Sequence, residues 1–389
     1  MADISAQLKQ VVELRGTLDR EQAGDLMRLL LSGEVSDVQV GALLAALATR
    51  GETAAEIAGF VDTMRAAAVD IPLTEEERAT LVDTCGTGGN ARGTFNISTA
   101  VALVAAAAGF PSGMRIAKHG NRGVTSKCGS ADVLKEMGVP VELSPAQAVQ
   151  CLRQTGFLFL YAPALHPAMR AVQHVRKALG IRTIFNILGP LTNPAGARAQ
   201  VLGVYSAHLV PLVAEALAML GVRHAMVVHG HNDLGIREQG TGSREQGAGS
   251  SDEGAGSGGQ RAEVQATAGQ QVPGCLDELT LTGPSEVAEV HGHTVALRRI
   301  TPEDVGLQRA PFAALAGGDA ATNAAILESI FAGEQGPRRD VVLFNAAAAL
   351  VVGGAAEDLV AGIRLAADAI DSGAVTALVE RLREFAKEH

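Results

Sequence analysis

Tryptophan is absent from the 389-residue chain, tyrosine occurs only twice, and aromatic residues make up 3% of the sequence. Proteins that hold single-stranded nucleic acid stack its bases on aromatic side chains, so this composition argues against such a surface. The formal net charge is −10 and no block of basic residues occurs. Binding to nucleic acid or to an anionic membrane relies on clustered lysine and arginine, so we expect neither partner.

Cysteine is scarce as well, and Cys85, Cys128, Cys151 and Cys275 are the only four. No Cys-x-x-Cys pair or Cys/His spacing typical of a metal site occurs, and a disulfide framework is not expected in so long a chain. We therefore expect reduced thiols in a cytoplasmic protein. The sequence places no recognisable base beside Cys85 or Cys128, so we interpret both as structural thiols rather than nucleophiles.

The N-terminus shows no signal-peptide pattern, and the apolar run over residues 100–109 is too short to span a bilayer. The chain is long enough for two domains, and its apolar fraction of 47% suffices for a sizeable core.

A glycine-rich stretch follows a short strand-like run at 81–83: residues 86–89 read Gly-Thr-Gly-Gly, and an apolar helical pattern begins after Asn96. Such a turn lets backbone N–H groups point into one concavity, to which the helix N-terminus adds positive partial charge. The stretch therefore suits a phosphate or pyrophosphate. Ser98 and Thr99 are expected to cap the helix or to face the anion or its metal. A tight turn before an ordinary N-cap explains the same residues without a ligand.

A second glycine-containing stretch, residues 119–132, follows the strand-like run 115–118. Its cations, hydroxyls and glycines suit a loop around a phosphorylated sugar. Ser130 or Asp132 is expected to begin the next helix. Two such loops after successive strands are much less expected by chance than one.

Together these motifs resemble the anthranilate phosphoribosyltransferase family. The resemblance rests on Gly-Thr-Gly-Gly at 86–89, Asn-Ile-Ser-Thr-Ala at 96–100, Lys-His-Gly-Asn-Arg at 118–122, Gly-Ser-Ala-Asp at 129–132, His-Pro-Ala-Met at 166–169, Val-Arg at 175–176, Arg-Thr-Ile-Phe-Asn at 182–186, Leu-Gly-Pro-Leu-Thr-Asn-Pro at 188–194 and Leu-Asp-Glu at 276–278.

The resemblance implies a set of residues that hold phosphoribosyl diphosphate: Gly86, Gly89, Asn90, Thr94, Asn96, Ile97, Ser98, Thr99, Lys118, His119, Gly120, Asn121, Arg122, Gly123, Val124, Thr125, Ser126 and Ser130. It also implies magnesium, with two ions per monomer, at Ser98, Asp277 and Glu278. Asn90 stands where many relatives carry aspartate, and glycine and cysteine at 123 and 128 replace frequent serines.

Arg176 lies in the helical run 167–179. An arginine on a helix is most often solvated or part of a structural ion pair, but it can hold a carboxylate with two hydrogen bonds. The resemblance implies that Arg176 holds the anthranilate carboxylate, and that Gly86 and Asn121 meet the same substrate.

The pattern predicts an α/β fold, with a largely parallel sheet domain flanked by helices plus a smaller all-helical domain. We expect helices over residues 1–78, with capping-box starts at Ser36 and Thr53, joined by the helical run of about 163–185. The α/β domain is expected over 79–389. Its Gly/Ser-rich stretch at about 232–274 is predicted to be a disordered insertion.

The strands expected from β-rich runs are 81–83, 115–118, 156–161, 201–205, 225–229, 279–281, 294–297 and 340–344. Residues 186–194 are interpreted as a turn-rich structural junction.

The resemblance implies transfer of the phosphoribosyl group to the anthranilate amine with release of diphosphate, in tryptophan biosynthesis, by a homodimer. The neutral aromatic amine needs no dedicated acid or base, so the site must mainly neutralise the leaving group. A pyrimidine-nucleoside phosphorylase and a non-enzymatic nucleic-acid-binding relative of the fold stay open as alternatives. The phosphorylase would need no magnesium, and the nucleic-acid binder would need a basic surface.

Overall fold

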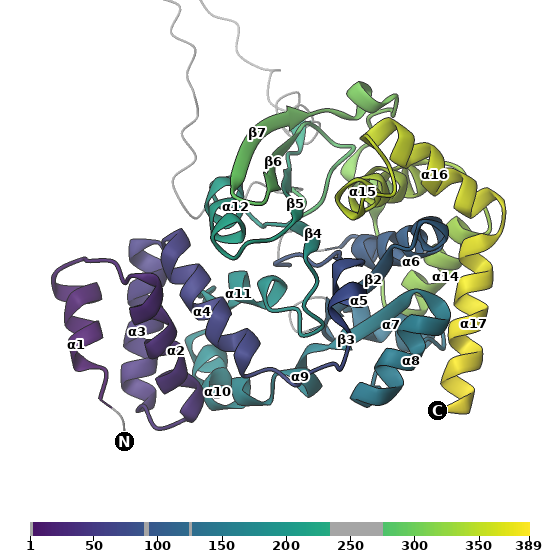
Figure 1. Cartoon of the computed structure of the whole chain (residues 1–389). Coiled ribbons are helices and arrows are strands. Elements are labelled where there is room, and N and C mark those ends of the chain that lie inside the picture. Colours follow the sequence, from purple (N-terminus) through teal and green to yellow (C-terminus); the bar gives the residue numbers. More distant parts are fainter. Residues whose placement is uncertain (1–2, 89–92, 124–126, 234–274) are drawn as a thin grey trace, which may run out of the picture.

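The computed structural model describes residues 3–88, 93–123, 127–233 and 275–389. Helices fill the N-terminal part, which lies at one end of the molecule, with the C-terminal helix at the other (Figure 1). The N-terminal elements are α1 (Ser5–Leu8), η1 (Lys9–Glu13), α2 (Arg20–Ser32), α3 (Asp37–Arg50), α4 (Ala54–Ala66) and α5 (Glu75–Ala79). The two predicted starts are confirmed, because the Ser36 hydroxyl accepts from the Gln39 N–H and Thr53 forms a capping box with Glu56.

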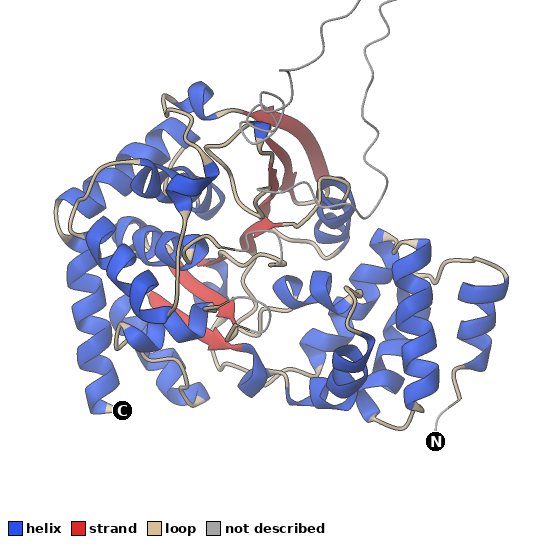
Figure 2. Ribbon diagram, turned by 180° about the vertical axis from the view of Figure 1, so that it is seen from behind, coloured by secondary structure: helices blue, strands red, loops and turns tan. Residues whose placement is uncertain are grey.

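The described residues form a seven-stranded sheet in the order β3-β2-β1-β4-β5-β6-β7 (Figure 2). Its strands are β1 (Leu81–Asp83), β2 (Arg115–Gly120), β3 (Phe157–Tyr161), β4 (Ala199–Gly203), β5 (His224–Gly230), β6 (Ser285–His291) and β7 (Thr294–Ile300). The first five strands run parallel, whereas β6 and β7 pair antiparallel. The predicted class, a largely parallel sheet with flanking helices and a helical N-terminal part, is confirmed.

Helices cover the sheet on both faces, as a parallel sheet requires because both of its faces are apolar. Among them, α6 (Ile97–Gly109), α8 (Pro145–Thr155), α12 (Leu209–Met219) and α15 (Pro337–Gly353) contact the strands directly. The remaining helices of this part of the chain are η2 (Phe110–Ser112), α7 (Ser130–Glu136), η4 (Pro302–Val305), η5 (Phe312–Leu315), α14 (Ala320–Phe331), α16 (Leu359–Asp371) and α17 (Ala374–Glu388).

Successive residues of β4 divide between two cores, because side chains alternate across a strand. Val201 packs in the core that contains α6 and α15. Leu202 packs in the core that contains α12 and the N-terminal helices. The N-terminal helices therefore share a continuous apolar core with one face of the sheet.

The chain between β3 and β4 returns to the N-terminal helices. It forms α9 (Ala162–Leu165), η3 (Pro167–Met169), α10 (Arg170–Leu179) and α11 (Phe185–Leu191). Val172 and Val175 of α10 pack in the same core as Leu43 of α3. The expectation that this run packs with the N-terminal helices is confirmed.

Three expectations about local structure were wrong. Residues 340–344 belong to α15, because a short buried apolar run reads the same way in a strand and in a buried helix. Residues 279–281 form no strand, and the run 285–291 that forms β6 was not predicted. Residues 186–191 lie in α11, so the expected junction is helical for most of its length.

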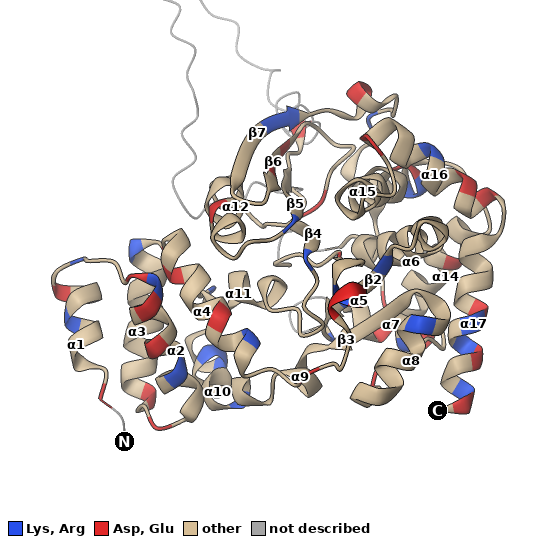
Figure 3. Cartoon of the chain, in the orientation of Figure 1, with Lys and Arg blue, Asp and Glu red and all other residues tan. Residues whose placement is uncertain are grey.

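Within the described residues, no helix combines the length and apolarity that crossing a membrane requires. Basic and acidic residues are interspersed along the helices at both ends of the molecule (Figure 3).

Candidate active site

The carboxyl ends of β1 and β4 meet where the strand order reverses, since β2 and β3 lie on one side of β1 and β4 and β5 on the other. Ligands of open α/β sheets bind in the crevice outside this switch point. The first glycine-rich loop crosses it: the Thr87 N–H donates to the Gly203 carbonyl at 2.8 Å, and the Tyr205 N–H donates to the Thr87 hydroxyl at 3.0 Å.

Glycine at 86 and 203 permits a close approach of Asp277. A Cβ at Gly203 would lie 1.5 Å from the Asp277 carbonyl oxygen, and one at Gly86 would lie 2.9 Å from its Oδ2. The backbone N–H of Gly88, which has a φ of 66°, donates to the same Oδ2 at 2.9 Å. The acidic pair therefore lies directly against the glycine loop, although Gly88 and Asp277 are 189 positions apart in the sequence.

The predicted metal residues converge at the N-terminus of α6. The Ser98 backbone lies near the Glu278 carboxylate and lowers its pKa, against the larger effects of burial and of the Asp277 charge. Lys118 is almost fully buried, and its Nζ donates to the Thr84 carbonyl at 2.7 Å and to the Ser98 hydroxyl at 3.2 Å. The expectation that Ser98 or Thr99 caps α6 was wrong: Asn96 occupies the N-cap position, and its side chain makes no capping bond.

Asp277 and Glu278 are half-buried side by side in a turn after Leu276, not at a strand entry. Burial raises the pKa of Asp277. Burial, and then the charge of Asp277, raise the pKa of Glu278 to about 8. Neither carboxylate forms an ion pair within the described part of the chain. Adjacent carboxylate oxygens and a hydroxyl are the donor set that Mg²⁺ prefers, and a cation there would offset the repulsion.

The second loop leaves the carboxyl end of β2 and is tied back to the start of α7. The Ser130 hydroxyl donates to the Asn121 carbonyl at 3.2 Å. The Asp132 carboxylate accepts from the N–H groups of Gly123 and Gly129, each at 2.9 Å, so Asp132 rather than Ser130 caps the helix. Arg122 pairs with Glu142 at 2.9 Å on the surface. Gly120 admits the Ser130 hydroxyl, which would lie 2.3 Å from a Cβ.

Asn96 and its neighbours connect the two loops. The Asn96 Nδ2 donates to the Cys128 carbonyl at 3.4 Å, and its Oδ1 accepts from Asn323 at 2.8 Å. Thr94 forms an isolated bridge with Ala316. Ile97 and Thr99 are buried, and their N–H groups donate to the carbonyls of Phe95 at 2.8 Å and Asn96 at 3.1 Å.

His119 lies near the end of β2, and its side chain is buried. Its Nδ1 lies 3.1 Å from the Gly189 carbonyl, and its ring centroid lies 5.1 Å from that of His166. Burial lowers the pKa of His119 to about 3 and that of His166 to about 4. Both rings are therefore neutral at pH 7, and within the described residues both Nε2 atoms are buried without a hydrogen-bond partner.

Arg176 stacks its guanidinium over the Phe185 ring, with 5.0 Å to the centroid. Burial lowers its pKa, and no carboxylate of the described residues forms an ion pair with it. Phe185 begins α11, and Gly189 of the same helix meets His119. Arg176 is thus a half-buried cation that packing, rather than a counter-charge, holds in place.

Five predicted ligands, Gly89, Asn90, Val124, Thr125 and Ser126, lie outside the described residues, as does most of the expected insertion. Sequence reasoning missed Asp83 and Asn193. The Asp83 carboxylate accepts from the His119 N–H at 3.1 Å and from the Asn193 amide at 2.8 Å. Burial raises the pKa of Asp83 to about 6. The position of Asp83 at a strand end was the available signal.

None of the four cysteines forms a disulfide, and all four lie within the described residues. Burial raises the pKa of Cys85, which agrees with its interpretation as an inert thiol.

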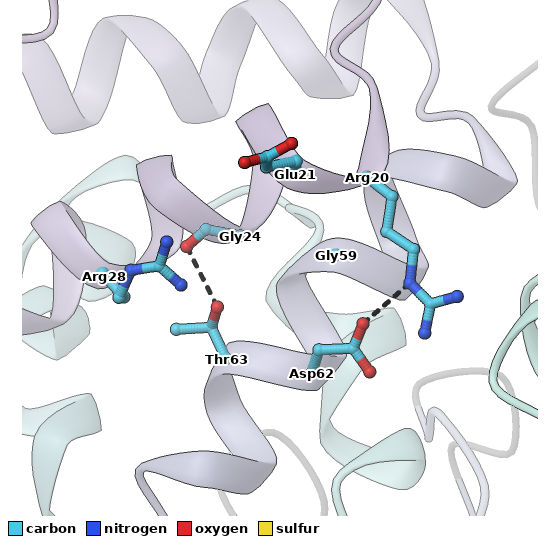
Figure 4. Close-up of a pocket in the computed structure, with 7 residues that line it drawn as sticks. All are labelled: Arg20, Glu21, Gly24, Arg28, Gly59, Asp62 and Thr63. Atoms are coloured by element: carbon cyan, nitrogen blue, oxygen red, sulfur yellow. Dashed lines mark hydrogen bonds and ion pairs between the residues drawn. The ribbon is translucent and has the colours of Figure 1, made fainter.

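A cavity of about 320 Å³ lies between α2 and α4 (Figure 4). The Arg20–Asp62 ion pair at 2.7 Å and the Thr63–Gly24 hydrogen bond at 2.9 Å link these helices there. No predicted site residue lines it, so it belongs to helix packing rather than to the candidate site.

The chain matches both domains of one family of transferases. The helical bundle domain of the glycosyl transferase family matches residues 7–68, and the a/b domain of the same family matches residues 78–242 and 259–376. The chain therefore has the two parts of this class of transferase in their order, and the match is interrupted within the stretch expected to be inserted.

Individual relatives show which family of transferases the chain resembles. Anthranilate phosphoribosyltransferase of Desulforamulus reducens is 44% identical over 370 residues, which cover 95% of this chain and 93% of the relative. The crystal structure of the Thermus thermophilus enzyme of that name aligns with a TM-score of 0.79 at 38% identity, over 98% of this chain and 99% of the other. The Saccharomyces cerevisiae enzyme, solved with PRPP and Mg, shares the fold at 24% identity and a TM-score of 0.78, over 99% and 98% of the two chains. The chain belongs to the anthranilate phosphoribosyltransferase family.

Proposed function

We propose that the protein transfers the 5-phosphoribosyl group of phosphoribosyl diphosphate to the amine of anthranilate, giving N-(5-phosphoribosyl)anthranilate and diphosphate in tryptophan biosynthesis. Family membership supports the reaction. The observation that carries it within this molecule is the convergence of the first glycine loop, Lys118 and the Asp277–Glu278 pair at the switch point of the sheet.

The protein groups at this edge suit the leaving group. Diphosphate departs with negative charge that must be neutralised, and backbone N–H groups at a helix N-terminus and a buried lysine do so without reorganising. The ammonium group of Lys118 is fixed by Thr84 and Ser98, so its charge is already in place. We assign phosphoribosyl diphosphate to the two loops and the start of α6. The proposed ligands are residues 86, 89, 90, 94, 96–99, 118–126 and 130.

Magnesium fits the acidic pair. Asp277, Glu278 and the Ser98 hydroxyl supply hard oxygen donors. A Mg²⁺ ion bound by these groups would help to neutralise the negative charge of the diphosphate. We propose two ions per monomer, and titration of the protein with Mg²⁺ measures this number.

Arg176 is proposed to bind the anthranilate carboxylate, and Gly86 and Asn121 to contact the same substrate. Its support is a half-buried guanidinium that stacks on Phe185 and forms no ion pair within the described residues. An arginine held in this way can offer two parallel hydrogen bonds to a carboxylate. Neutral His119 and His166 provide an uncharged wall near α11.

We further propose two domains, residues 1–78 with the run 163–185, and residues 79–389. We also propose a homodimer that acts in the cytoplasm. The matched family domains at 7–68 and at 78–242 with 259–376 support the division, and reduced thiols suit the compartment.

The test follows the loss of anthranilate fluorescence with phosphoribosyl diphosphate, in Mg²⁺ and in EDTA. We expect magnesium-dependent consumption. In Arg176→Ala, kcat/KM for anthranilate should fall roughly 10- to 100-fold, the range for losing a charged hydrogen-bonded contact. Arg170→Ala provides a matched control, because Arg170 is an exposed arginine on the same helix.

No consumption by folded wild-type protein would refute the reaction. Equal losses in the two arginine variants would move the carboxylate contact elsewhere. Phosphorolysis of a pyrimidine nucleoside without magnesium would instead support the alternative enzyme.

A further inference from the structure

A second cluster of metal-binding side chains lies at the carboxyl end of β5, separate in chemistry from the acidic pair. His229, His231 and Cys275 each offer one ligand atom, and these atoms lie within 4.8 Å of one another. Two imidazoles and a thiol form a nitrogen–sulfur donor set, whereas the Asp277–Glu278 pair offers only oxygen. Nitrogen and sulfur donors favour zinc and other borderline or soft metals over magnesium.

The histidines of this cluster are already oriented by other groups. Nδ1 of His229 lies 2.8 Å from the Val204 carbonyl, and Nε2 of His231 lies 3.0 Å from the Glu286 carboxylate. Either bond fixes the ring proton on the bonded nitrogen and leaves the lone pair on the other. Metal-ligating histidines are almost always held in this way, by a carbonyl or a carboxylate on the far nitrogen.

The backbone supports the cluster as well. Gly230 and Leu276 form an isolated bridge, with hydrogen bonds of 2.8 and 2.9 Å, so that His231 and Cys275 are held beside each other. His229 and Cys275 are buried, while His231 is partly exposed and gives access from solvent. Tetrahedral zinc, with bonds of about 2.0–2.3 Å, places its ligand atoms roughly 3.3–3.8 Å apart. The present separations are at most 4.8 Å, so zinc binding requires side-chain rotations that bring the ligand atoms closer by up to about 1 Å.

A comparison cluster within the molecule lacks these features. His224, Glu289 and His291 also come within 4.8 Å of one another. Glu289 is already engaged, because Arg298 pairs with it at 2.8 Å and His224 bonds to it at 2.9 Å. A carboxylate neutralised by arginine is a weak metal ligand, so this cluster is explained as a surface ion-pair network.

We propose that His229, His231 and Cys275 bind one Zn²⁺ ion per chain, with the fourth position open to water or to another ligand. Binding forms two Zn–N bonds and one Zn–S bond, and the Cys275 thiol proton passes to solvent. The ion would fasten β5 to the segment that carries Asp277 and Glu278, two and three residues after Cys275. The site thus acts as a clasp beside the proposed magnesium site.

The experiment titrates metal-stripped, full-length protein with Co²⁺ in excess Mg²⁺, which saturates the oxygen site. We expect one equivalent of Co²⁺ to produce a thiolate-to-cobalt charge-transfer band and tetrahedral visible bands, and Zn²⁺ to abolish both. Cys275→Ser should lose the charge-transfer band. Glu286→Gln, which keeps all three ligands, should weaken zinc binding roughly 10- to 100-fold.

Cys85→Ser and His291→Gln are the matched controls, and both should retain the spectrum. Circular dichroism of each variant checks folding, and His231→Gln replaces Cys275→Ser if the latter does not fold. A wild-type protein without the thiolate band, or a band that survives in Cys275→Ser, would overturn the proposal. Neither result depends on transferase activity, so this test fails independently of the proposed reaction.

Discussion

Two glutamates, Glu56 in the helical part and Glu278 at the sheet edge, have opposite surroundings. Glu56 is fully buried, yet it accepts hydrogen bonds from the N–H groups of Leu18 and Thr53, each at 2.9 Å, and pairs with Arg50. Glu278 is half-buried beside a second carboxylate, Asp277, whose charge raises its pKa.

The difference distinguishes a glutamate that stabilises the fold from a glutamate that is placed to bind a ligand. The partners of Glu56 complete its hydrogen bonding and neutralise its charge within the fold, which is how buried charges are normally tolerated. The surroundings of Glu278 leave repulsion that a bound cation would relieve. A site prepared for a ligand is recognisable by this incomplete compensation.

The largest expected effect separates the two acids by activity. Glu278→Gln should lower kcat/KM roughly 10²- to 10³-fold, because it removes a ligand of the proposed Mg²⁺ that offsets the charge of the leaving group. Without Mg²⁺, the variant should unfold at a temperature no lower than that of the wild type, because the substitution removes an acid whose ionised form burial disfavours. Steady-state kinetics and calorimetry measure the two quantities, and a large loss of stability with normal activity would reverse the comparison.

Glu56→Gln should show the converse. The free energy of unfolding should fall by about 3 kcal/mol, because Arg50 loses its buried counter-charge. Activity per folded molecule should stay close to wild type. Urea denaturation measures the first and kinetics at low temperature the second. An activity loss as large as that of Glu278→Gln would assign Glu56 to the site.

His166 is a buried base whose hydrogen bonding is incomplete, because its Nε2 has no partner within the described residues. Burial lowers its pKa from 6.5 to about 4, so between these values the unfolded chain binds a proton that the folded protein does not. The free energy of unfolding should therefore fall as pH drops from 6.5 to 4. The slope in His166→Gln should be shallower by up to about 1.4 kcal/mol per pH unit. If the free energy of unfolding depends on pH with the same slope in the two proteins, this account is refuted.

The smallest effect is expected at Glu77. It forms the same capping box as Glu56, with the Thr74 N–H at 2.9 Å, but its partner Arg153 is exposed and 2.6 Å away. Glu77→Gln should lower the free energy of unfolding by about 1 kcal/mol or less, the range for a surface pair. A loss equal to that of Glu56→Gln would show that burial does not govern the difference.

The sequence carried the local part of this comparison but not the distant part. The capping box of Thr53 and Glu56 is visible from spacing, whereas the Leu18 N–H reaches Glu56 from 38 residues away. Likewise the glycine loop and the acidic pair were each predicted, but not that Gly88 donates to Asp277. Contacts of this kind depend on packing that no single-sequence pattern records.

The wrong strand at 279–281 has a specific cause. The Asn345 side chain accepts from the Leu279 N–H at 2.9 Å and donates to the Leu279 carbonyl at 2.8 Å. A buried amide thus takes the place of a neighbouring strand and satisfies the backbone of an apolar segment that would otherwise pair. Asn345 lies in α15, far along the chain, so the substitution could not be read locally.

The paired backbone at Gly230 and Leu276 makes this point of the chain a natural place for variation in length. The two hydrogen bonds join the chain on either side of residues 231–275. The pairing at this point therefore does not depend on the number of residues between them. The entropy of closing a segment grows only with the logarithm of its length, about 0.6 kcal/mol per doubling. An enzyme of this architecture can therefore gain or lose a stretch here, or accept a fused peptide or new chain ends, at little thermodynamic expense.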